Sequence, residues 1–281
     1  MHFLDFLYAV IIGIIQGITE WLPISSTGHM ILANEVIKLP VSEAFWNMFL
    51  VVIQLGSILA VLFLYFHKLN PFSPRKSAKQ KRDTLQLWLK VIVGIIPAGV
   101  IGVLFDDIVE SVLSGPIVVA IALIAYGVLF LVLERRPREP KVKTLNQLSY
   151  KNALQIGCFQ VLSLIPGTSR SGSTILGGMI CGTSREVAAE FSFFLAIPVM
   201  FGASLLRGAK FFLSGTPITG LEIGILITGV IVAFVVSVFA IKFLMGYIRK
   251  HDFKAFGYYR IVLGIIVILY FAIKWKWIFF A

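Results

Sequence analysis

The sequence predicts an all-α polytopic membrane protein, with about six transmembrane helices and two re-entrant helical hairpins in an inverted-topology repeat. Of the 281 residues, 58% are hydrophobic and only 14% are charged, whereas a soluble domain carries about 25% charged residues. Six apolar segments are long enough to cross a bilayer, and two further apolar regions are broken by Pro, Gly and Ser. These features disfavour a soluble domain, a disordered chain and a β-barrel, which needs strands of alternating polarity.

The six predicted spans each offer close to the ~20 apolar residues that the hydrocarbon core requires. They are residues 45–66, 88–105, 116–134, 187–206, 221–245 and 259–277. The two broken regions are residues 3–37, interrupted at 23–28, and residues 153–182, interrupted at 166–172. Because each half of a broken region is short, we expect two re-entrant hairpins. Residues 1–281 are expected to form a single integral membrane domain.

The basic residues predict the orientation of the chain. Two predicted loops, 67–90 and 135–151, hold 13 of the 25 Lys and Arg residues. Cytoplasmic loops carry an excess of Lys and Arg, so both loops, and a third at 249–254, are predicted to be cytoplasmic. The acidic loop 106–115 and both chain ends are then expected outside. The net charge of +11 therefore reflects topology, and no nucleic-acid partner is expected.

The two breaks resemble each other and indicate an internal repeat. The first reads PISSTG from Pro23 and the second PGTSRSG from Pro166, and Ile-Leu follows two residues after each. Repeat one is expected at about 1–134 and repeat two at about 150–277. Each repeat contains one hairpin and three spans. Three spans are an odd number, so the second repeat must insert upside down, which brings both breaks to a polar site near the midplane.

Polar and ionisable residues around the breaks are candidates for function, because a charge inside the bilayer costs roughly 2.5–3.5 kcal/mol. Gln16 and Glu20 share one helix face just before the first break, and Arg170 lies within the second break. The full candidate set is Gln16, Glu20, Ser25, Ser26, Thr27, His29, Ser169, Arg170, Ser171 and Thr174.

Together these residues predict a phosphate site. Arg170 offers a planar fork for phosphate oxygens, and hydroxyls and helix N-termini add neutral donors. Glu20 suits a hard divalent cation such as Mg²⁺ or Ca²⁺, completed by phosphate oxygens and water. Ser26 precedes His29 by three residues, close enough to pair within a helix. Either Ser26 attacks with His29 as base, or His29 itself attacks or activates water.

The segments QGITEWLPISSTGH, from Gln16, and PGTSRSGST, from Pro166, resemble the two signature motifs of the BacA family of undecaprenyl-diphosphate phosphatases. The length, span layout and repeat extend this resemblance over essentially the whole chain. It implies a multi-pass protein of the bacterial plasma membrane that hydrolyses undecaprenyl diphosphate to undecaprenyl phosphate. The reaction recycles the carrier lipid for peptidoglycan synthesis and confers bacitracin resistance. The resemblance also implies an active site facing the outer side and dependence on a divalent cation.

The resemblance assigns roles residue by residue. Glu20 matches the essential glutamate, Ser26 and His29 match the catalytic pair, and Arg170 matches the phosphate-binding arginine. Ser169, Ser171 and Thr174 match the hydroxyls around that arginine. Gln16 stands where other members have Glu, so one carboxylate must suffice at this helix face.

The expected partners are the bilayer and a polyprenyl diphosphate lipid, and a homodimer is compatible with the sequence. The alternative function is a transporter or flippase of polyprenyl phosphate, because inverted repeats with midplane breaks are also a transporter architecture. A carrier needs Arg170 but has no need of both Ser26 and His29. A purely structural scaffold leaves the buried Glu20 and Arg170 unexplained.

Overall fold

The computed structural model describes residues 2–37, 39–113, 115–135 and 139–280, and the side chains of these residues except 2, 106–112 and 275–280. In this part of the chain six helical segments are long and apolar enough to cross a membrane. They are α3 with α4 (Glu43–Val52, Gln54–Leu64), α6 (Ala78–Leu113), α7 (Pro116–Arg135), α10 (Arg185–Leu213), α11 (Gly220–Ile248) and α12 (Lys254–Phe280). The predicted all-α, six-span fold is thereby confirmed.

The two broken regions form pairs of shorter helices. The first pair is α1 (His2–Thr19) and α2 (Ser26–Val36). The second pair is α8 (Tyr150–Val161) and α9 (Arg170–Ile180), with a 3-10 turn at Leu162–Leu164 between them. The remaining short elements are α5 (Phe66–Leu69) and a 3-10 turn at Leu145–Gln147. Each break overlaps the predicted one but begins earlier in the chain: residues 20–25 and 162–169 separate the helices, whereas residues 26–28 and 170–172 already belong to α2 and α9.

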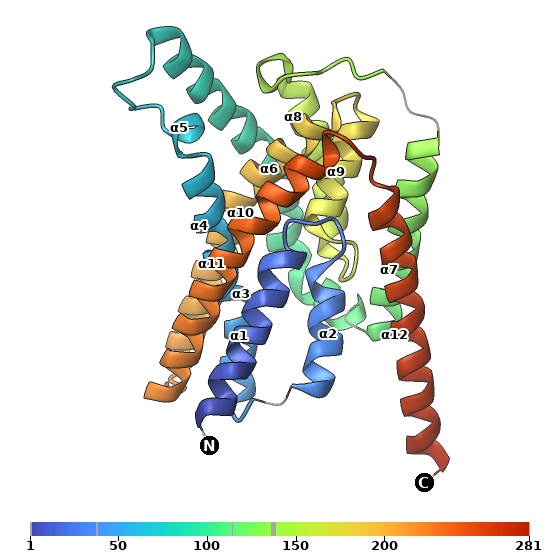
Figure 1. Cartoon of the computed structure of the whole chain (residues 1–281). Coiled ribbons are helices and arrows are strands. Elements are labelled where there is room, and N and C mark those ends of the chain that lie inside the picture. Colours follow the sequence, from blue (N-terminus) through green and yellow to red (C-terminus); the bar gives the residue numbers. More distant parts are fainter. Residues whose placement is uncertain (1, 38, 114, 136–138, 281) are drawn as a thin grey trace.

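The two helix pairs point in opposite directions (Figure 1). The pair α1–α2 opens toward the end of the molecule where both chain termini lie, and the pair α8–α9 opens toward the other end. Each pair is followed by three spans, and corresponding spans of the two halves run in opposite directions. The loop between α4 and α6 and the loop between α11 and α12 lie at the end away from the termini, together with residues 139–149. The described parts of the predicted basic loops are therefore gathered at one end.

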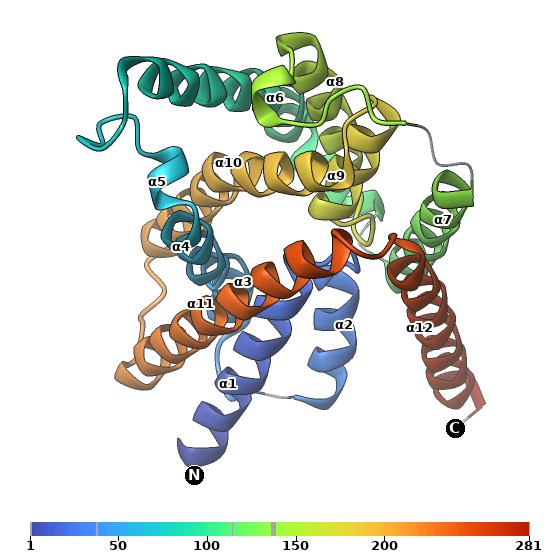
Figure 2. The same cartoon turned by 45° about the horizontal axis from the view of Figure 1, so that its top comes forward.

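Small residues allow the helices to approach closely, as is common in membrane proteins. A side chain on Gly157 of α8 would place its Cβ 2.2 Å from the carbonyl oxygen of Gly94 in α6. A Cβ on Gly127 of α7 would lie 2.7 Å from the carbonyl oxygen of Gly257 in α12. Both views show α7 beside α12 along their lengths (Figures 1 and 2). The glycines thus fix the spacing of the helices that surround the two breaks.

The core is built around α10, whose Phe191, Phe193 and Phe194 are fully buried and belong to the largest apolar cluster. Trp21, directly after Glu20, joins the same cluster and meets Phe193 edge to face at 5.2 Å between ring centroids. Many large apolar side chains on the outer faces of the spans are exposed, as lipid-facing positions require. The first break is therefore packed into the centre of the molecule.

Candidate active site

The two breaks share an unusual local geometry. Ser25 and Ser169 are the only non-glycine residues with positive φ in the part of the chain that the structure describes, at 72° and 70°. Each caps the helix that follows: the Ser25 hydroxyl accepts from the backbone N–H of Gly28 at 3.4 Å, and the Ser169 hydroxyl accepts from that of Gly172 at 3.2 Å. Glycine would relieve the backbone strain but would remove the capping oxygen. Ser26 and Arg170 therefore occupy equivalent first positions of α2 and α9.

A buried ion pair joins the two breaks. Arg170 Nη2 donates to Glu20 Oε1 at 3.1 Å, and the side chains of Arg170 and Glu20 are only 11% and 7% exposed. The guanidinium also lies over the Trp21 ring, 5.5 Å from its centroid. Removing one partner of such a pair would leave an uncompensated buried charge, which costs about 3–5 kcal/mol. The two halves of the chain are thus coupled at the predicted phosphate site.

The second oxygen of Glu20 collects polar side chains from the first break. Gln16 Nε2 donates to Oε2 at 3.0 Å, and Ser26 Oγ donates to the same oxygen at 3.3 Å. Gln16 and Glu20 do share one helix face, as their spacing predicts. The neutral amide lets one carboxylate serve this site without the repulsion that a second carboxylate would introduce.

The outer side of Arg170 is held by Ser192 of α10, which sequence reasoning missed. Arg170 Nη1 donates to the Ser192 carbonyl oxygen at 2.9 Å, and the hydroxyls of Ser192 and Thr174 are hydrogen-bonded at 2.6 Å. A polar residue within an apolar span was the signal available in the sequence. In the described part of the chain the Nε–H of Arg170 and the indole N–H of Trp21 are buried without a hydrogen-bond partner. Each is a donor that a ligand oxygen would satisfy.

His29 makes two hydrogen bonds away from Glu20. Its Nδ1 lies 2.7 Å from the Ser25 carbonyl oxygen, and its Nε2 lies 2.7 Å from the Tyr259 hydroxyl. A carbonyl oxygen only accepts, so Nδ1 carries the proton, and in the neutral ring Nε2 accepts from Tyr259. The predicted helix between Ser26 and His29 exists, but the single hydroxyl proton of Ser26 points to Glu20. The Ser26–His29 hydrogen bond that the spacing suggests is therefore not formed in this structure.

The remaining candidates are Ser169, Ser171 and Thr174, which make hydrogen bonds around Arg170, and Thr27 on α2. Ser171 Oγ donates to the Leu22 carbonyl oxygen at 3.3 Å and so joins the two breaks, and it lies 3.1 Å from Ser169 Oγ. Thr174 Oγ1 donates to the Arg170 carbonyl oxygen at 2.9 Å as well as contacting Ser192. Thr27 is exposed on the first turn of α2, and the hydrogen bonds given above do not include it.

Arg260 of α12 is a second buried arginine at the breaks, and sequence reasoning missed it. Its side chain is fully buried and donates to the carbonyl oxygens of Pro23, Gly167 and Thr168. It lies near the start of the predicted span 259–277. The rule that singled out Arg170, an ionisable residue inside an apolar segment, applies equally to Arg260.

The electrostatics of the site favour an anion with several oxygens. The N-termini of α2 and α9 both lie at the breaks, and a helix N-terminus carries partial positive charge. Arg170 and Arg260 add two positive charges, and Glu20 supplies one negative charge. The site therefore has an excess of positive charge suited to a phosphate group.

The residues at Glu20 fit a hard divalent cation. The Glu20 carboxylate and the Ser26 hydroxyl are neighbouring oxygen ligands, and oxygen is what Mg²⁺ and Ca²⁺ prefer. Gln16 turns its amide nitrogen toward the same carboxylate. Among the described residues no group of three or more His, Cys, Asp or Glu side chains forms a metal site. A cation at Glu20 would therefore rely on phosphate oxygens and water for the rest of its shell.

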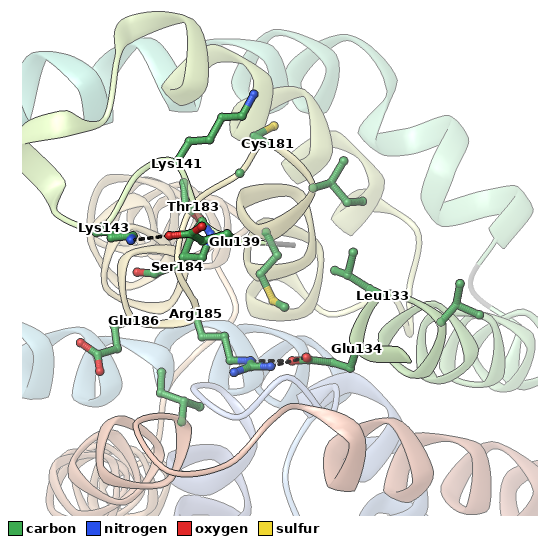
Figure 3. Close-up of a pocket in the computed structure, with 16 residues that line it drawn as sticks. Leu133, Glu134, Glu139, Lys141, Lys143, Cys181, Thr183, Ser184, Arg185 and Glu186 are labelled. Atoms are coloured by element: carbon green, nitrogen blue, oxygen red, sulfur yellow. Dashed lines mark hydrogen bonds and ion pairs between the residues drawn. The ribbon is translucent and has the colours of Figure 1, made fainter. Parts of the chain in front are cut away.

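A pocket of about 890 Å³ lies apart from these residues (Figure 3). The helix ends that line it are at the end of the molecule away from the termini (Figure 1). The pocket is lined by the ends of α7, α9 and α11, the start of α10 with the residues before it, and residues 139–141 and 143. Arg185 Nε donates to Glu134 Oε1 at 2.8 Å, and Lys143 pairs with Glu139 at 3.0 Å (Figure 3). Glu134 and Arg185 thus lie at helix ends, and the pocket contains none of the candidate site residues.

Fold and site together define a multi-pass membrane protein in which two broken helices meet at a buried, positively charged polar site. The chain belongs to the family described as bacitracin resistance protein BacA, which matches residues 9–266. The resemblance seen in the two sequence motifs is thereby confirmed.

The curated relatives match over nearly the full chain. One, named Undecaprenyl-diphosphatase 1, from Clostridioides difficile (strain 630), is 61% identical over 95% of this chain and 97% of its own length. Proteins named Undecaprenyl-diphosphatase from Acetivibrio thermocellus and Enterococcus faecalis are 58% and 57% identical, over 95% and 96% of this chain and 98% and 99% of their own lengths.

Proposed function

We propose that this chain is an integral membrane phosphatase that hydrolyses undecaprenyl diphosphate to undecaprenyl phosphate and inorganic phosphate. The observation that carries the proposal is the Glu20–Arg170 pair, held between the N-termini of α2 and α9. Relatives that are 55–61% identical carry the name of this activity. The product is the carrier lipid for cell-wall synthesis, and its release accounts for the bacitracin resistance in the family description.

The substrate binds with its diphosphate at the breaks and its apolar tail between the spans in lipid. When the substrate binds, Arg170 exchanges the Glu20 carboxylate for phosphate oxygens, to which its Nη2 and its unpaired Nε then donate. The N–H groups at the start of α2 and α9 and the hydroxyls around Arg170 complete the cradle. Phosphoryl transfer depends mostly on such positioning and charge neutralisation.

Ser26 is the nucleophile that the geometry favours. Its Oγ attacks the terminal phosphorus while its proton moves to Glu20 Oε2, which it contacts at 3.3 Å. The bond from that phosphorus to the bridging oxygen breaks, and undecaprenyl phosphate leaves. Water then hydrolyses the phosphoserine. His29, one turn along α2, is the alternative nucleophile or the group that activates water.

A divalent cation is part of the proposal. Glu20 would hold it, with Gln16 and Ser26 beside it, and a bound cation would neutralise charge on the phosphate oxygens. Once Arg170 has turned to the phosphate, Glu20 Oε1 would be free to bind this cation, and Oε2 would accept the Ser26 proton.

We also propose that the site faces the outer side of the bacterial plasma membrane. The described parts of the basic loops gather at one end of the molecule (Figure 1), and basic loops stay in the cytoplasm. The pair α1–α2 opens toward the opposite end. In a bilayer, α1–α2 and α8–α9 then form re-entrant hairpins from the outer and cytoplasmic sides.

The decisive experiment measures phosphate release from undecaprenyl diphosphate by the purified protein with Mg²⁺ or Ca²⁺. We expect wild type to release phosphate, a chelator to stop the reaction, and Glu20→Ala and Arg170→Ala each to lower kcat/KM by about 100-fold or more. Glu190→Gln is the matched control, because Glu190 pairs with Lys68 at 2.6 Å outside the site. No release by wild type would refute the phosphatase. Movement of labelled polyprenyl phosphate across vesicles without phosphate release would support the transporter instead.

A further inference from the structure

Arg260 lies where the two breaks meet, and its contacts join them. Nη1 donates to the Pro23 carbonyl oxygen of the first break at 3.1 Å. Nη2 donates to the Gly167 and Thr168 carbonyl oxygens of the second break at 2.9 and 3.0 Å. Nε donates to the Leu123 carbonyl oxygen of α7 at 3.4 Å. One side chain thus contacts both repeats and the span that packs beside α12.

Arg260 carries a buried charge that is balanced in an unusual way. Its side chain is fully buried, and within the described chain its hydrogen bonds go to backbone carbonyls and not to a carboxylate. The guanidinium also lies over the Tyr126 ring, 5.3 Å from its centroid. Four carbonyl dipoles and one aromatic face offset the desolvation of the charge. Arg170, by contrast, is paired with Glu20.

The carbonyls of Pro23, Gly167 and Thr168 need a partner because they lie in the helix breaks. A break inside a membrane protein frees backbone oxygens that no water is available to satisfy. Arginine presents five donors in a fixed plane and therefore satisfies several oxygens at once, whereas lysine has a single ammonium group. Gly172 makes room for the fork, since a Cβ there would lie 3.1 Å from Arg260 Nη1.

The oxygens held by Arg260 are close in sequence to the reacting side chains. Pro23 precedes the strained cap Ser25 by two residues, and Thr168 directly precedes the strained cap Ser169. Those caps begin the helices that present Ser26 and Arg170. Fixing the two carbonyl positions therefore fixes the separation of Ser26 and Glu20 from Arg170.

We propose that Arg260 is the positioning residue of the phosphatase: it clamps the two helix breaks together so that Glu20 and Ser26 of one repeat meet Arg170 of the other. The effect on turnover rests on the proposed function, but the clamp itself does not. A misplacement of about 1 Å at a reacting group can cost on the order of 100-fold in rate. Loss of the clamp is therefore expected to lower kcat more than it raises KM.

The test compares Arg260→Met and Arg260→Lys with wild type in the same detergent. The first readout, amide hydrogen exchange in peptides covering 20–28 and 164–172, requires no activity. We expect exchange in both peptides to accelerate about tenfold or more in Arg260→Met and less in Arg260→Lys, because the ammonium reaches fewer carbonyls. Lys274→Met is the matched control on α12, since Lys274 pairs with Glu35 at 2.6 Å away from the breaks.

The second readout is turnover per folded molecule, measured on monodisperse protein. We expect kcat to fall about 100-fold in Arg260→Met with KM changed less than about threefold, and Arg260→Lys to recover part of kcat. If Arg260→Met does not fold, the exchange rates and kcat of Arg260→Lys are compared with those of wild type to test the clamp. Wild-type exchange at either break in the variants, or a lower yield of folded protein with unchanged kcat, would overturn the clamp. If the wild type releases no phosphate but the Arg260 variants still show faster exchange at both breaks, the phosphatase is refuted and the clamp is supported.

Discussion

Ser26 and His29 show how much a residue's role depends on its neighbours. Their spacing on α2 suggests a hydrogen-bonded pair, but Ser26 donates to Glu20 and His29 contacts the Ser25 carbonyl and Tyr259. The partner of His29 comes from α12, 230 positions away in the chain. No local pattern in the sequence encodes a contact of that separation.

The nucleophile is therefore best tested at Ser26 itself. With Ser26→Ala we expect kcat to fall about 1,000-fold, since the residual rate comes from the phosphate cradle alone. Substrate labelled in its terminal phosphate should leave label on wild-type protein after rapid acid quench, with Ser26 as the modified residue. Label on His29 instead, or near-normal turnover in Ser26→Ala, would exclude Ser26 as nucleophile. Tyr259→Phe is the companion variant, because it keeps the ring and removes the hydroxyl that His29 contacts.

Strained serines at the breaks are another residue-scale feature that the sequence conceals. Ser25 and Ser169 look like ordinary hydroxyl candidates for substrate binding. The structure uses their oxygens as helix caps at positive φ, a geometry that their backbone adopts only because the surrounding protein enforces it.

At the scale of elements, glycine contacts decide how the broken helices fit between the spans. Gly157 of α8 lies directly against the backbone of Gly94 in α6. In α6 itself, Gly99 has open space where a Cβ would lie. The sequence shows both as glycines in apolar helices, and nothing in their local pattern separates them.

This difference predicts opposite outcomes for two similar substitutions. Gly157→Ala places a Cβ 2.2 Å from a backbone oxygen, so α8 must move, and we expect a loss of about 1–3 kcal/mol in stability. Gly99→Ala should be neutral or slightly stabilising because alanine favours helix. Thermal unfolding in detergent, followed by the retained monodisperse fraction, measures both. Equal melting temperatures for Gly157→Ala and wild type would contradict the close packing.

The whole molecule is organised by charge as well as by apolar length. The described parts of the basic loops lie at one end, both chain termini lie at the other, and the two helix pairs open to opposite ends (Figure 1). An odd number of spans in each half places the two breaks face to face. This geometry turns two similar sequence motifs into one asymmetric site, with the carboxylate from the first half and the guanidinium from the second.

Orientation in the cell membrane is the prediction at this scale. The start of α6, which includes Lys79, lies at the basic end, and the loop between α10 and α11, which includes Pro217, lies at the end of the termini (Figure 1). Both positions can be replaced by cysteine in a variant without Cys158 and Cys181. We expect a membrane-impermeant thiol reagent to label Pro217→Cys in intact cells and Lys79→Cys only after the cells are broken. The reverse pattern would place the basic loops and the active site on the opposite sides from those proposed.

Much of this protein is determined by the sequence alone. Apolar length predicts six spans, Pro-Gly-Ser runs predict both breaks, and isolated ionisable residues indicate Glu20 and Arg170, because a bilayer penalises every charge and every unpaired backbone group. Tertiary structure alone decides the partners of those residues: Ser192 behind Arg170, Tyr259 beside His29, and Arg260 across both breaks. Helix periodicity is a local property of the chain, whereas these contacts arise only when spans far apart in sequence are packed against each other.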